Sequence, residues 1–400
     1  MRTGLVVVLL AWAGLAVAAA ESPSTPAAAT QPAAASQPSG ATAAPPASSP
    51  APPPAAPPPA RRKLTFEPHV LVDLQAAPFP DDAPDVGQHP HATGDDRAGV
   101  ARVRRAWLGA SGRLPGPFAY RLSFATWDGA EVDDGRLRTA RMRLLDTWVA
   151  LAPGPWLAVG AGELPVGFMR ARLAETADEP LFERPRFVDR LTPDRRLGGA
   201  AWGDLGMIGY RLGVYRAVPT WAGEGASWPW DGPLVAGRLE IQPIGPLRVT
   251  RPCDPWFDRA RVAIGAAALY GPGRDLQRLA FAADLSFAWR HLLLRGEALF
   301  VRVTAAGAER RSFGFFVEGT YRVWRFVEVE ARHEWSDGNT RDDPFGSDLP
   351  REWATTVGAA LLLAEDRVRL GVAYVHREGS LPSGPSGAAD AALFGVRGRY

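Results

Sequence analysis

A strict alternation of apolar and polar side chains is the main signal in most of this chain. Around residue 330, Val327 and Val329 alternate with Glu328 and Glu330. Successive side chains of a strand point to opposite faces, so this period of two predicts a strand with one apolar and one charged face. An amphipathic helix would repeat every three or four residues instead. The same period recurs at 117–127, 277–289, 311–322 and 367–377.

Extended along the chain, the alternation predicts an all-β fold of sixteen strands. Most of these are near the roughly 9–11 residues that a tilted strand needs to cross a membrane. An even number of antiparallel strands closes a barrel without a free edge, so the expected architecture is a transmembrane antiparallel β-barrel. A soluble sandwich or a secreted adhesin is the competing all-β fold. The predicted strands are 66–74, 100–110, 117–127, 140–151, 155–163, 196–204, 207–217, 233–242, 259–270, 277–289, 292–303, 311–322, 326–336, 351–363, 367–377 and 391–400.

The connections between these strands are expected to alternate between short turns and long polar loops, as in outer-membrane barrels. Those at 111–116 and 152–154 are short. The long ones are rich in Gly, Pro and Asp, and they span 75–98, 164–195, 218–232, 337–350 and 378–390.

Aromatic residues near strand ends predict girdles at the two membrane interfaces. The tryptophans concerned are Trp127, Trp156, Trp202, Trp289, Trp335 and Trp353. In the last strand Phe394, Val396 and Tyr400 share one face, opposite Arg397 and Arg399. This terminal pattern resembles the signal that the outer-membrane assembly machinery reads, and it argues against the soluble alternatives.

The N-terminal segment has the form of a secretory signal peptide, predicted at 1–20. Arg2 precedes an apolar run from Leu5 to Val17, and alanines stand at the expected cleavage site. The run is shorter than the roughly twenty residues of a spanning helix. A Pro/Ala-rich stretch over 21–62 predicts an extended linker, and 63–400 would be the barrel. The expected location is the outer membrane of a Gram-negative bacterium, in contact with its lipid.

Charge and cysteine content narrow the possibilities. The chain has 45 basic and 43 acidic side chains with a net charge of +2, and the charges are interleaved rather than clustered. No nucleic-acid partner is therefore expected. Cys253 is the only cysteine, so an intrachain disulfide is excluded.

Three stretches give the chain a resemblance to the phosphate-selective porin O and P family over most of 61–400. They are 104–112, 159–168, and 181–185 followed by 194–198. The resemblance implies a sixteen-stranded homotrimer with an inward-folded loop that narrows the pore. It also implies arginines along the route of an anion. The chain departs from the family in having a single lysine, Lys63, before the first strand, so the lysine part of the family's anion site is missing.

The inward loop would be 164–195, where arginines are interleaved with apolar anchors. A guanidinium offers a planar fork of donors to oxyanions and stays charged at every relevant pH. Such groups can replace part of an anion's hydration at a constriction. The anchors would pin the loop to the wall, and they are Phe168, Leu173, Leu181, Phe182 and Phe187. The candidate loop arginines are Arg170, Arg172, Arg184, Arg186, Arg190, Arg195 and Arg196.

By their position in the alternation, further arginines are expected on the lumen wall. They are Arg102, Arg104, Arg121, Arg211, Arg238, Arg290 and Arg322. Acidic residues share these faces, so part of the arginine charge is expected in salt bridges. These are Glu240, Asp284, Glu318, Glu328, Glu330 and Glu334.

Two other classes of function compete with a channel. A barrel enzyme needs a nucleophile, a base and an orienting group held together, whereas the six histidines are scattered. No cofactor or metal is expected. An adhesive barrel would have outward loops with less use for apolar anchors. The sequence therefore predicts a passive porin for inorganic anions or small solutes, anion-preferring or, alternatively, non-selective.

Overall fold

The computed structural model describes residues 64–77, 100–130, 132–133, 136–137, 143–174, 179–181, 184–216, 232–247, 257–273, 276–305, 308–338, 351–364, 366–380 and 386–399. These residues belong to one compact unit, Ala60–Tyr400. The expected signal peptide and linker, Cys253 and Tyr400 lie outside the described residues. No helix in the described ranges is long and apolar enough to cross a membrane.

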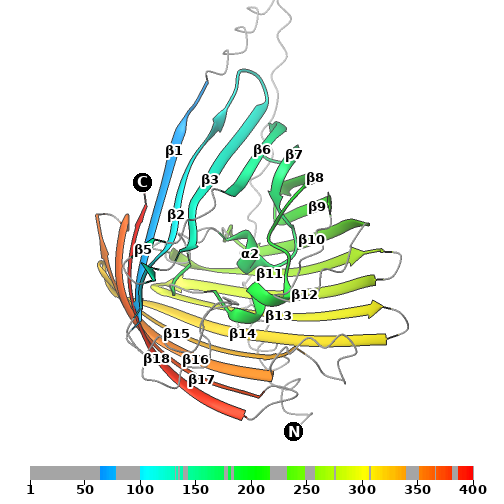
Figure 1. The fold of residues 1–400 in the computed structure, drawn as a ribbon. Coiled ribbons are helices and arrows are strands. Elements are labelled where there is room, and N and C mark those ends of the chain that lie inside the picture. The colour runs from blue at the N-terminus through cyan, green and yellow to red at the C-terminus, as the bar shows by residue number, and fades with distance from the viewer. Residues whose placement is uncertain are drawn as a thin grey trace, which may run out of the picture. The chain divides into compact units, whose positions relative to one another are not determined.

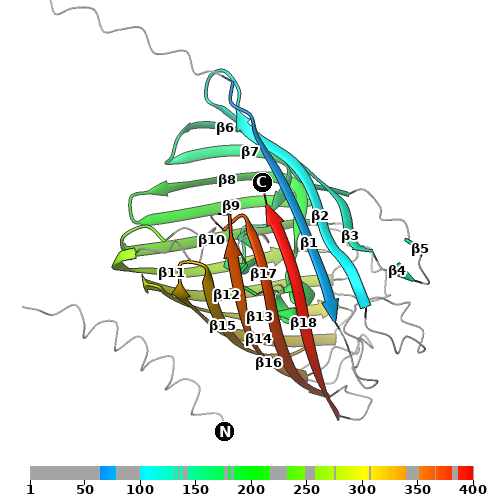
Figure 2. The same cartoon turned by 90° about the vertical axis from the view of Figure 1, so that its left-hand side faces the viewer.

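Sixteen of the described strands form a closed antiparallel barrel, in which β1 pairs with β18 to complete the ring (Figures 1 and 2). A two-stranded hairpin of β4 (Val132–Asp133) and β5 (Arg136–Leu137) lies outside the barrel sheet. The barrel strands are β1 (Glu67–Ala77), β2 (Val100–Arg113), β3 (Phe118–Ala130), β6 (Arg143–Gly154), β7 (Leu157–Pro165), β8 (Arg195–Leu205), β9 (Ile208–Arg216), β10 (Pro233–Ile244), β11 (Phe257–Gly271), β12 (Leu276–Arg290), β13 (Leu292–Ala305), β14 (Ala308–Trp324), β15 (Val327–Asp337), β16 (Arg351–Leu363), β17 (Val368–Ser380) and β18 (Ser386–Arg399).

Each predicted strand overlaps one barrel strand, so the predicted fold class is confirmed. One detail of the connections was wrong. The pairing of β17 with β18 continues to Ser380 and Ser386, so the long loop expected at 378–390 shrinks to 381–385. The end of β17 and the start of β18 are rich in polar and small residues. They show no apolar alternation, so the sequence did not indicate that these strand ends are paired.

The barrel wall exposes its apolar side chains and buries its charged ones, which is the reverse of a soluble protein. On β10, Leu239 and Ile241 are 57% and 50% exposed on the outer surface, whereas Arg238 and Glu240 are 4% and 7% exposed inside the barrel. A wall with apolar side chains outside and charged side chains inside suits a barrel surrounded by lipid. The buried core of this molecule therefore lies in the lumen.

Aromatic side chains near the strand ends partly follow the predicted girdles. Trp156 and Trp289 are exposed at the turn side of the barrel, and Trp335 and Trp353 are half-buried near its other end. Trp202 was predicted there wrongly. Its ring packs edge-on against Trp148 at 5.6 Å, beside the lumen core. The side chain of Trp127 lies outside the described residues.

Candidate functional site: an inward loop on a charged inner wall

The connection between β7 and β8 folds into the barrel, as predicted (Figure 1). It carries two short helices, α2 (Arg170–Leu173) and α3 (Arg186–Leu191), which the sequence analysis missed. Near the end of β7, Gly162 has φ +138°, and a Cβ there would lie 2.1 Å from the carbonyl oxygen of Thr147. Only glycine fits this backbone position, from which the chain continues into the lumen. We call residues 166–194 the inward loop.

Apolar contacts hold the inward loop against the inner wall. Phe168 and Phe187 are each 1% exposed and belong to one cluster with wall residues of β8 to β14. The ring of Phe187 lies 6.2 Å from that of Phe316. Gly314 makes this approach possible, because a Cβ there would come within 2.6 Å of the Phe187 ring. Of the other predicted anchors, Leu181 is buried, Leu173 is half-buried and Phe182 lies outside the described residues.

The first ionic anchor joins α2 to β10 and β12. Arg170 donates from Nη1 to Glu240 Oε2 at 2.9 Å and from Nη2 to the carbonyl oxygen of Leu247 at 2.9 Å. Arg238 donates to both oxygens of Asp284, at 2.6 and 2.9 Å, and to Glu240 at 2.8 Å. Leu247 is itself buried against Ala263 on the inner wall. Arg170 thus connects the inward loop to a segment that follows β10 at the turn side of the barrel.

A second group of charges braces the inward loop internally and joins β8, where the loop ends, to β3 and β6. Arg172 contacts Asp189 at 2.8 Å and donates to Thr192 Oγ1 at 2.9 Å, which braces α2 against α3. Arg195, the first residue of β8, donates to Asp146 at 2.8 and 3.2 Å. Arg121 of β3 approaches the same carboxylate at 3.5 Å. These arginines therefore act first as structural cations of the loop.

The third anchor is the Glu179 carboxylate, which is 2% exposed. It accepts hydrogen bonds from Arg295 of β13 at 2.5 Å and from Arg184 at 3.4 Å. Arg397 of β18 donates to the backbone carbonyl of Glu179 at 2.8 Å. Burial alone would raise the pKa of Glu179, but Arg295 and Arg184 outweigh it and hold the pKa below its ordinary value. Glu179 is therefore ionised, and its carboxylate holds the inward loop to the wall. We call this residue the latch.

The fourth anchor lies at the start of α3. The backbone N–H of Arg186 donates to Glu334 at 2.7 Å, and its guanidinium lies 3.5 Å from Glu352. Around it the inner faces of β14 to β17 carry alternating charges: Arg322 and Arg369 both contact Glu328, and Arg369 also contacts Glu330. The inner wall therefore holds acidic groups beside its arginines, as the sequence predicted.

Comparisons with known proteins bear on the fold. No protein-family model matches the chain, and no curated protein matches it. Among solved structures, the outer-membrane channel DcaP of Acinetobacter baumannii matches with a TM-score of 0.60 at 11% identity, covering 84% of this chain and 98% of that one. The anion-selective porin from Comamonas acidovorans matches with a TM-score of 0.56 at 14% identity, over 84% and 100% of the two chains.

A third solved structure is OmpT of Vibrio cholerae in its trimer form, folded in vitro. It matches with a TM-score of 0.54 at 11% identity, over 85% of this chain and 100% of that one. The chain has a porin fold. At these identities the likeness extends to the fold alone, and the narrower resemblance to phosphate-selective porins receives no separate support.

The structure brings most of the predicted arginines together around the inward loop. Arg196 is half-buried at the start of β8, and Arg211 stacks on Trp202 at 5.2 Å beside Gly167 of the loop. Arg290 was wrongly placed on the lumen wall. It is exposed at the last position of β12, has φ +50°, and its guanidinium lies 5.0 Å from the Trp289 ring. The side chains of Arg102, Arg104 and Arg190 lie outside the described residues.

Sequence reasoning missed several partners of these arginines. Glu179 of the loop pairs with Arg295 of the wall, and Asp146 pairs with Arg195 where the loop joins β8; none of Asp146, Glu179 and Arg295 was singled out. Arg295 follows three leucines, Leu292 to Leu294, which interrupt the apolar alternation. The sequence therefore does not indicate whether Arg295 lies on the inner or the outer face of its strand. Arg397 was assigned to the inner face, and it is 2% exposed there beside Asp73.

Proposed function

We propose that this protein is a passive diffusion channel of the bacterial outer membrane, exported by its signal peptide. The observation that carries the proposal is a closed barrel with charged residues inside and the inward loop packed on part of the inner wall. A loop held by four separate anchors narrows a lumen reproducibly and sets which solutes pass. Phe394 and Val396 lie exposed on the outer face of β18, which suits a role in recognition by the assembly machinery.

The channel prefers small anions, with phosphate or a similar oxyanion as the class of solute. The only lysine is Lys63, so the cationic groups of the described lumen are arginines. Most are fully engaged, but Arg121 and Arg186 remain 21% and 16% exposed within their ion pairs. A guanidinium that solvent can reach attracts a passing oxyanion through its charge and its planar fork of N–H groups. This preference is the trait that would relate the chain to the phosphate-selective family rather than to general porins.

Replacement of Arg121 and Arg186 by glutamine together should reduce the preference for anions without closing the channel. The measurement is the reversal potential of the purified full chain in planar bilayers under a potassium chloride gradient. We expect an anion-favouring potential that moves toward zero in the double variant. The matched control is Arg302→Gln, because Arg302 is 46% exposed beside Glu309 and away from the loop. A cation-favouring wild-type potential would contradict the anion proposal.

An enzymatic role receives no support from the described histidines. His69 lies 2.6 Å from the Ser111 hydroxyl, but in the described part of the chain no carboxylate is hydrogen-bonded to this imidazole to complete a triad. His376 contacts Asp390 at 2.7 Å, yet on the outer surface of β17 and β18. Within the described residues, no three His, Cys, Asp or Glu side chains form a group that could hold a metal.

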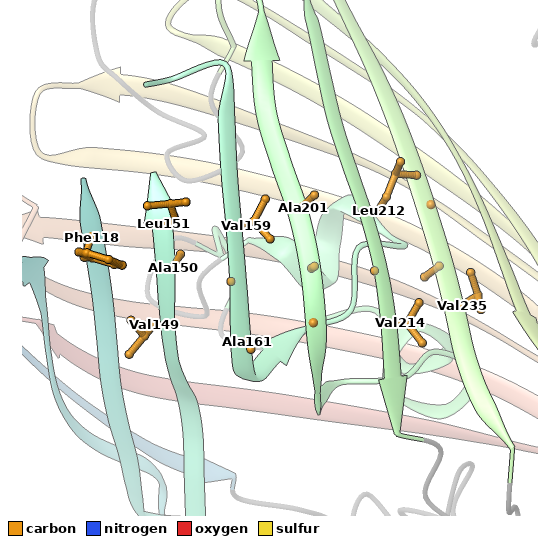
Figure 3. Close-up of a pocket in the computed structure, with 16 residues that line it drawn as sticks. Phe118, Val149, Ala150, Leu151, Val159, Ala161, Ala201, Leu212, Val214 and Val235 are labelled. Carbon is orange, nitrogen blue, oxygen red and sulfur yellow. The ribbon is translucent and has the colours of Figure 1, made fainter. Parts of the chain in front are cut away.

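We propose that the chain forms a trimer. The outer surface of the barrel offers a face for contact with a second copy of the chain. A groove of about 840 Å³ crosses β3 and β6 to β10, and Figure 3 shows Leu151, Val159, Leu212 and Val235 around it. None of its lining residues has a polar side chain, and they include Gly199 and Ala201. Small residues let a partner's wall approach closely. The trimer form named for the Vibrio cholerae structure supports this choice of occupant.

A tryptophan placed in this groove should therefore reduce self-association. Gly199→Trp is suitable, because the nearest heavy atom to a Cβ there is 3.7 Å away and the side chain would project from the wall. Ala331→Trp, on the exposed face of β15, is the matched control. Cross-linking in detergent should show fewer oligomers for the first variant only. Equal oligomer content in both would rule the groove out as the contact.

A further inference from the structure

A row of buried carboxylates lies on the inner wall where α2 is anchored. The strand register aligns Glu240 of β10 with Gly265, Gly265 with Asp284 of β12, and Asp284 with Glu297 of β13. The three acids are 7%, 6% and 4% exposed. Gly265 leaves room for Arg238 between the first two, since a Cβ there would lie 2.3 Å from Arg238 Nη2. The strand register therefore places three acidic side chains next to one another, and each of them is almost fully shielded from solvent.

The guanidinium groups of Arg238 and Arg170 lie beside this row. Both are hydrogen-bonded to the first two acids, Glu240 and Asp284, or to one of them. Arg238 gives its two Nη groups to Asp284 and Glu240, and Arg170 gives Nη1 to Glu240. The second Nη of Arg170 goes to the carbonyl of Leu247. Three carboxylates thus share two cations, which leaves one negative charge uncompensated if all three acids are ionised.

Glu297 is the third acid of the row. Neither of its carboxylate oxygens has a hydrogen-bond partner among the described residues. Arg295, on the same strand, is used by Glu318 and Glu179. On the β14 side the register neighbour of Glu297 is Phe316, which has no charge to offer.

The charged groups that act on Glu297 lie on β10, β12, β13 and α2, and among the described residues β14 contributes none. They are Asp284 on β12, Arg238 on β10, Arg295 on β13 and Arg170 on α2. The three arginines already carry carboxylate partners, and Asp284 repels a second negative charge. A buried, unpaired carboxylate is far less costly when it is protonated. A proton also supplies an O–H donor that the ionised form lacks.

We propose that Glu297 is a proton-binding site of the lumen wall, which keeps the carboxylate row beneath α2 neutral overall at neutral pH. Loss of this proton at alkaline pH places an uncompensated negative charge beside Arg170 and Asp284. Through the channel proposed above, on which this step rests, that charge lowers the preference for anions. Glu297 is a positioning and charge-balancing residue, and it does not need to contact the solute.

Infrared spectroscopy of the folded full chain in lipid tests the site without requiring conduction. At neutral pH the spectrum of the wild type should contain a protonated-carboxyl stretch that shifts in heavy water and disappears at alkaline pH. Glu297→Gln should remove this band, and Glu297→Leu should do the same. Glu318→Gln is the control, because Glu318 accepts a hydrogen bond from Arg295 at 2.7 Å, and this substitution should leave the band in place. A band unchanged by both Glu297 substitutions, or absent from the wild type, overturns the proposal.

The conduction measurement adds the functional half of the test. In planar bilayers the wild-type reversal potential should move toward cations as the pH is raised, and Glu297→Gln should remove that movement. The same alkaline shift in wild type and Glu297→Gln would overturn the link between Glu297 and selectivity. A barrel that shows the infrared band but does not conduct would contradict the proposed function and leave the proton site standing.

Discussion

Removal of the inward loop should raise the single-channel conductance severalfold. The variant replaces residues 167–193 by a short Gly/Ser turn, which is feasible because β7 and β8 remain paired up to Pro165 and Arg195. Conductance grows with the open cross-section of the pore, and this loop fills part of the lumen between β8 and β18 with helices and side chains. The barrel itself should persist, since its backbone hydrogen bonds run from strand to strand and do not involve the loop.

The deletion variant is first checked for folding by heat-modifiable mobility on gels, which reports barrel closure. Its currents in planar bilayers are then compared with those of the wild type at the same salt concentration. A folded variant with unchanged conductance would show that the loop does not narrow the conducting path. A closed lumen in the wild type that opens only in the variant would identify the loop as a plug.

Substitution of Glu179 by glutamine should release the inward loop from the wall. Loss of the carboxylate removes an ionic contact of Arg184 and weakens the contact of the loop with Arg295. Breaking one buried ion pair costs about 3 kcal/mol, which corresponds to roughly a hundredfold faster local opening. Hydrogen exchange of backbone amides in the loop measures this directly, and single-channel currents should become noisier.

The pH dependence of the same latch follows from the lowered pKa of Glu179. A carboxyl whose folded pKa is depressed contributes its stability above the unfolded pKa and loses it as the pH falls through the folded value. Loop exchange in the wild type should therefore accelerate in acid, below about pH 4. In Glu179→Gln this part of the acid response should be absent.

The matched control for Glu179 is Glu309→Gln. Glu309 also pairs with two arginines, Arg302 and Arg311, but it is 26% exposed at the start of β14. Partly exposed pairs contribute about 0–1 kcal/mol, so this variant should leave loop exchange almost unchanged. Equal effects of the two substitutions would contradict the role of Glu179 as a latch.

The barrel could be predicted from the sequence because each strand carries its own signal. Alternation is local, and the side on which Arg238 or Glu328 lies follows from counting residues along one strand. The same argument placed Arg397 inside the barrel. It failed at Arg290, where the strand ends in a turn and the parity of the preceding residues no longer applies.

The contacts of the inward loop could not be predicted in the same way. Glu179 meets Arg295 across 116 positions of sequence, and Arg186 meets Glu352 across 166. Such pairs depend on the path of the loop through the lumen, which no period in the sequence encodes. The arginines were recognised as candidates for an anion route, but their engagement by Glu240, Asp146 and Glu179 became visible only in the fold. We therefore propose that selectivity rests on the less buried members of the set.

The most direct test of the account is the current through the purified full chain in a planar bilayer. A narrowed, water-filled barrel predicts discrete and ohmic conductance steps, with a reversal potential that favours anions in a potassium chloride gradient. A correctly folded barrel that inserts and carries no current would contradict the channel itself.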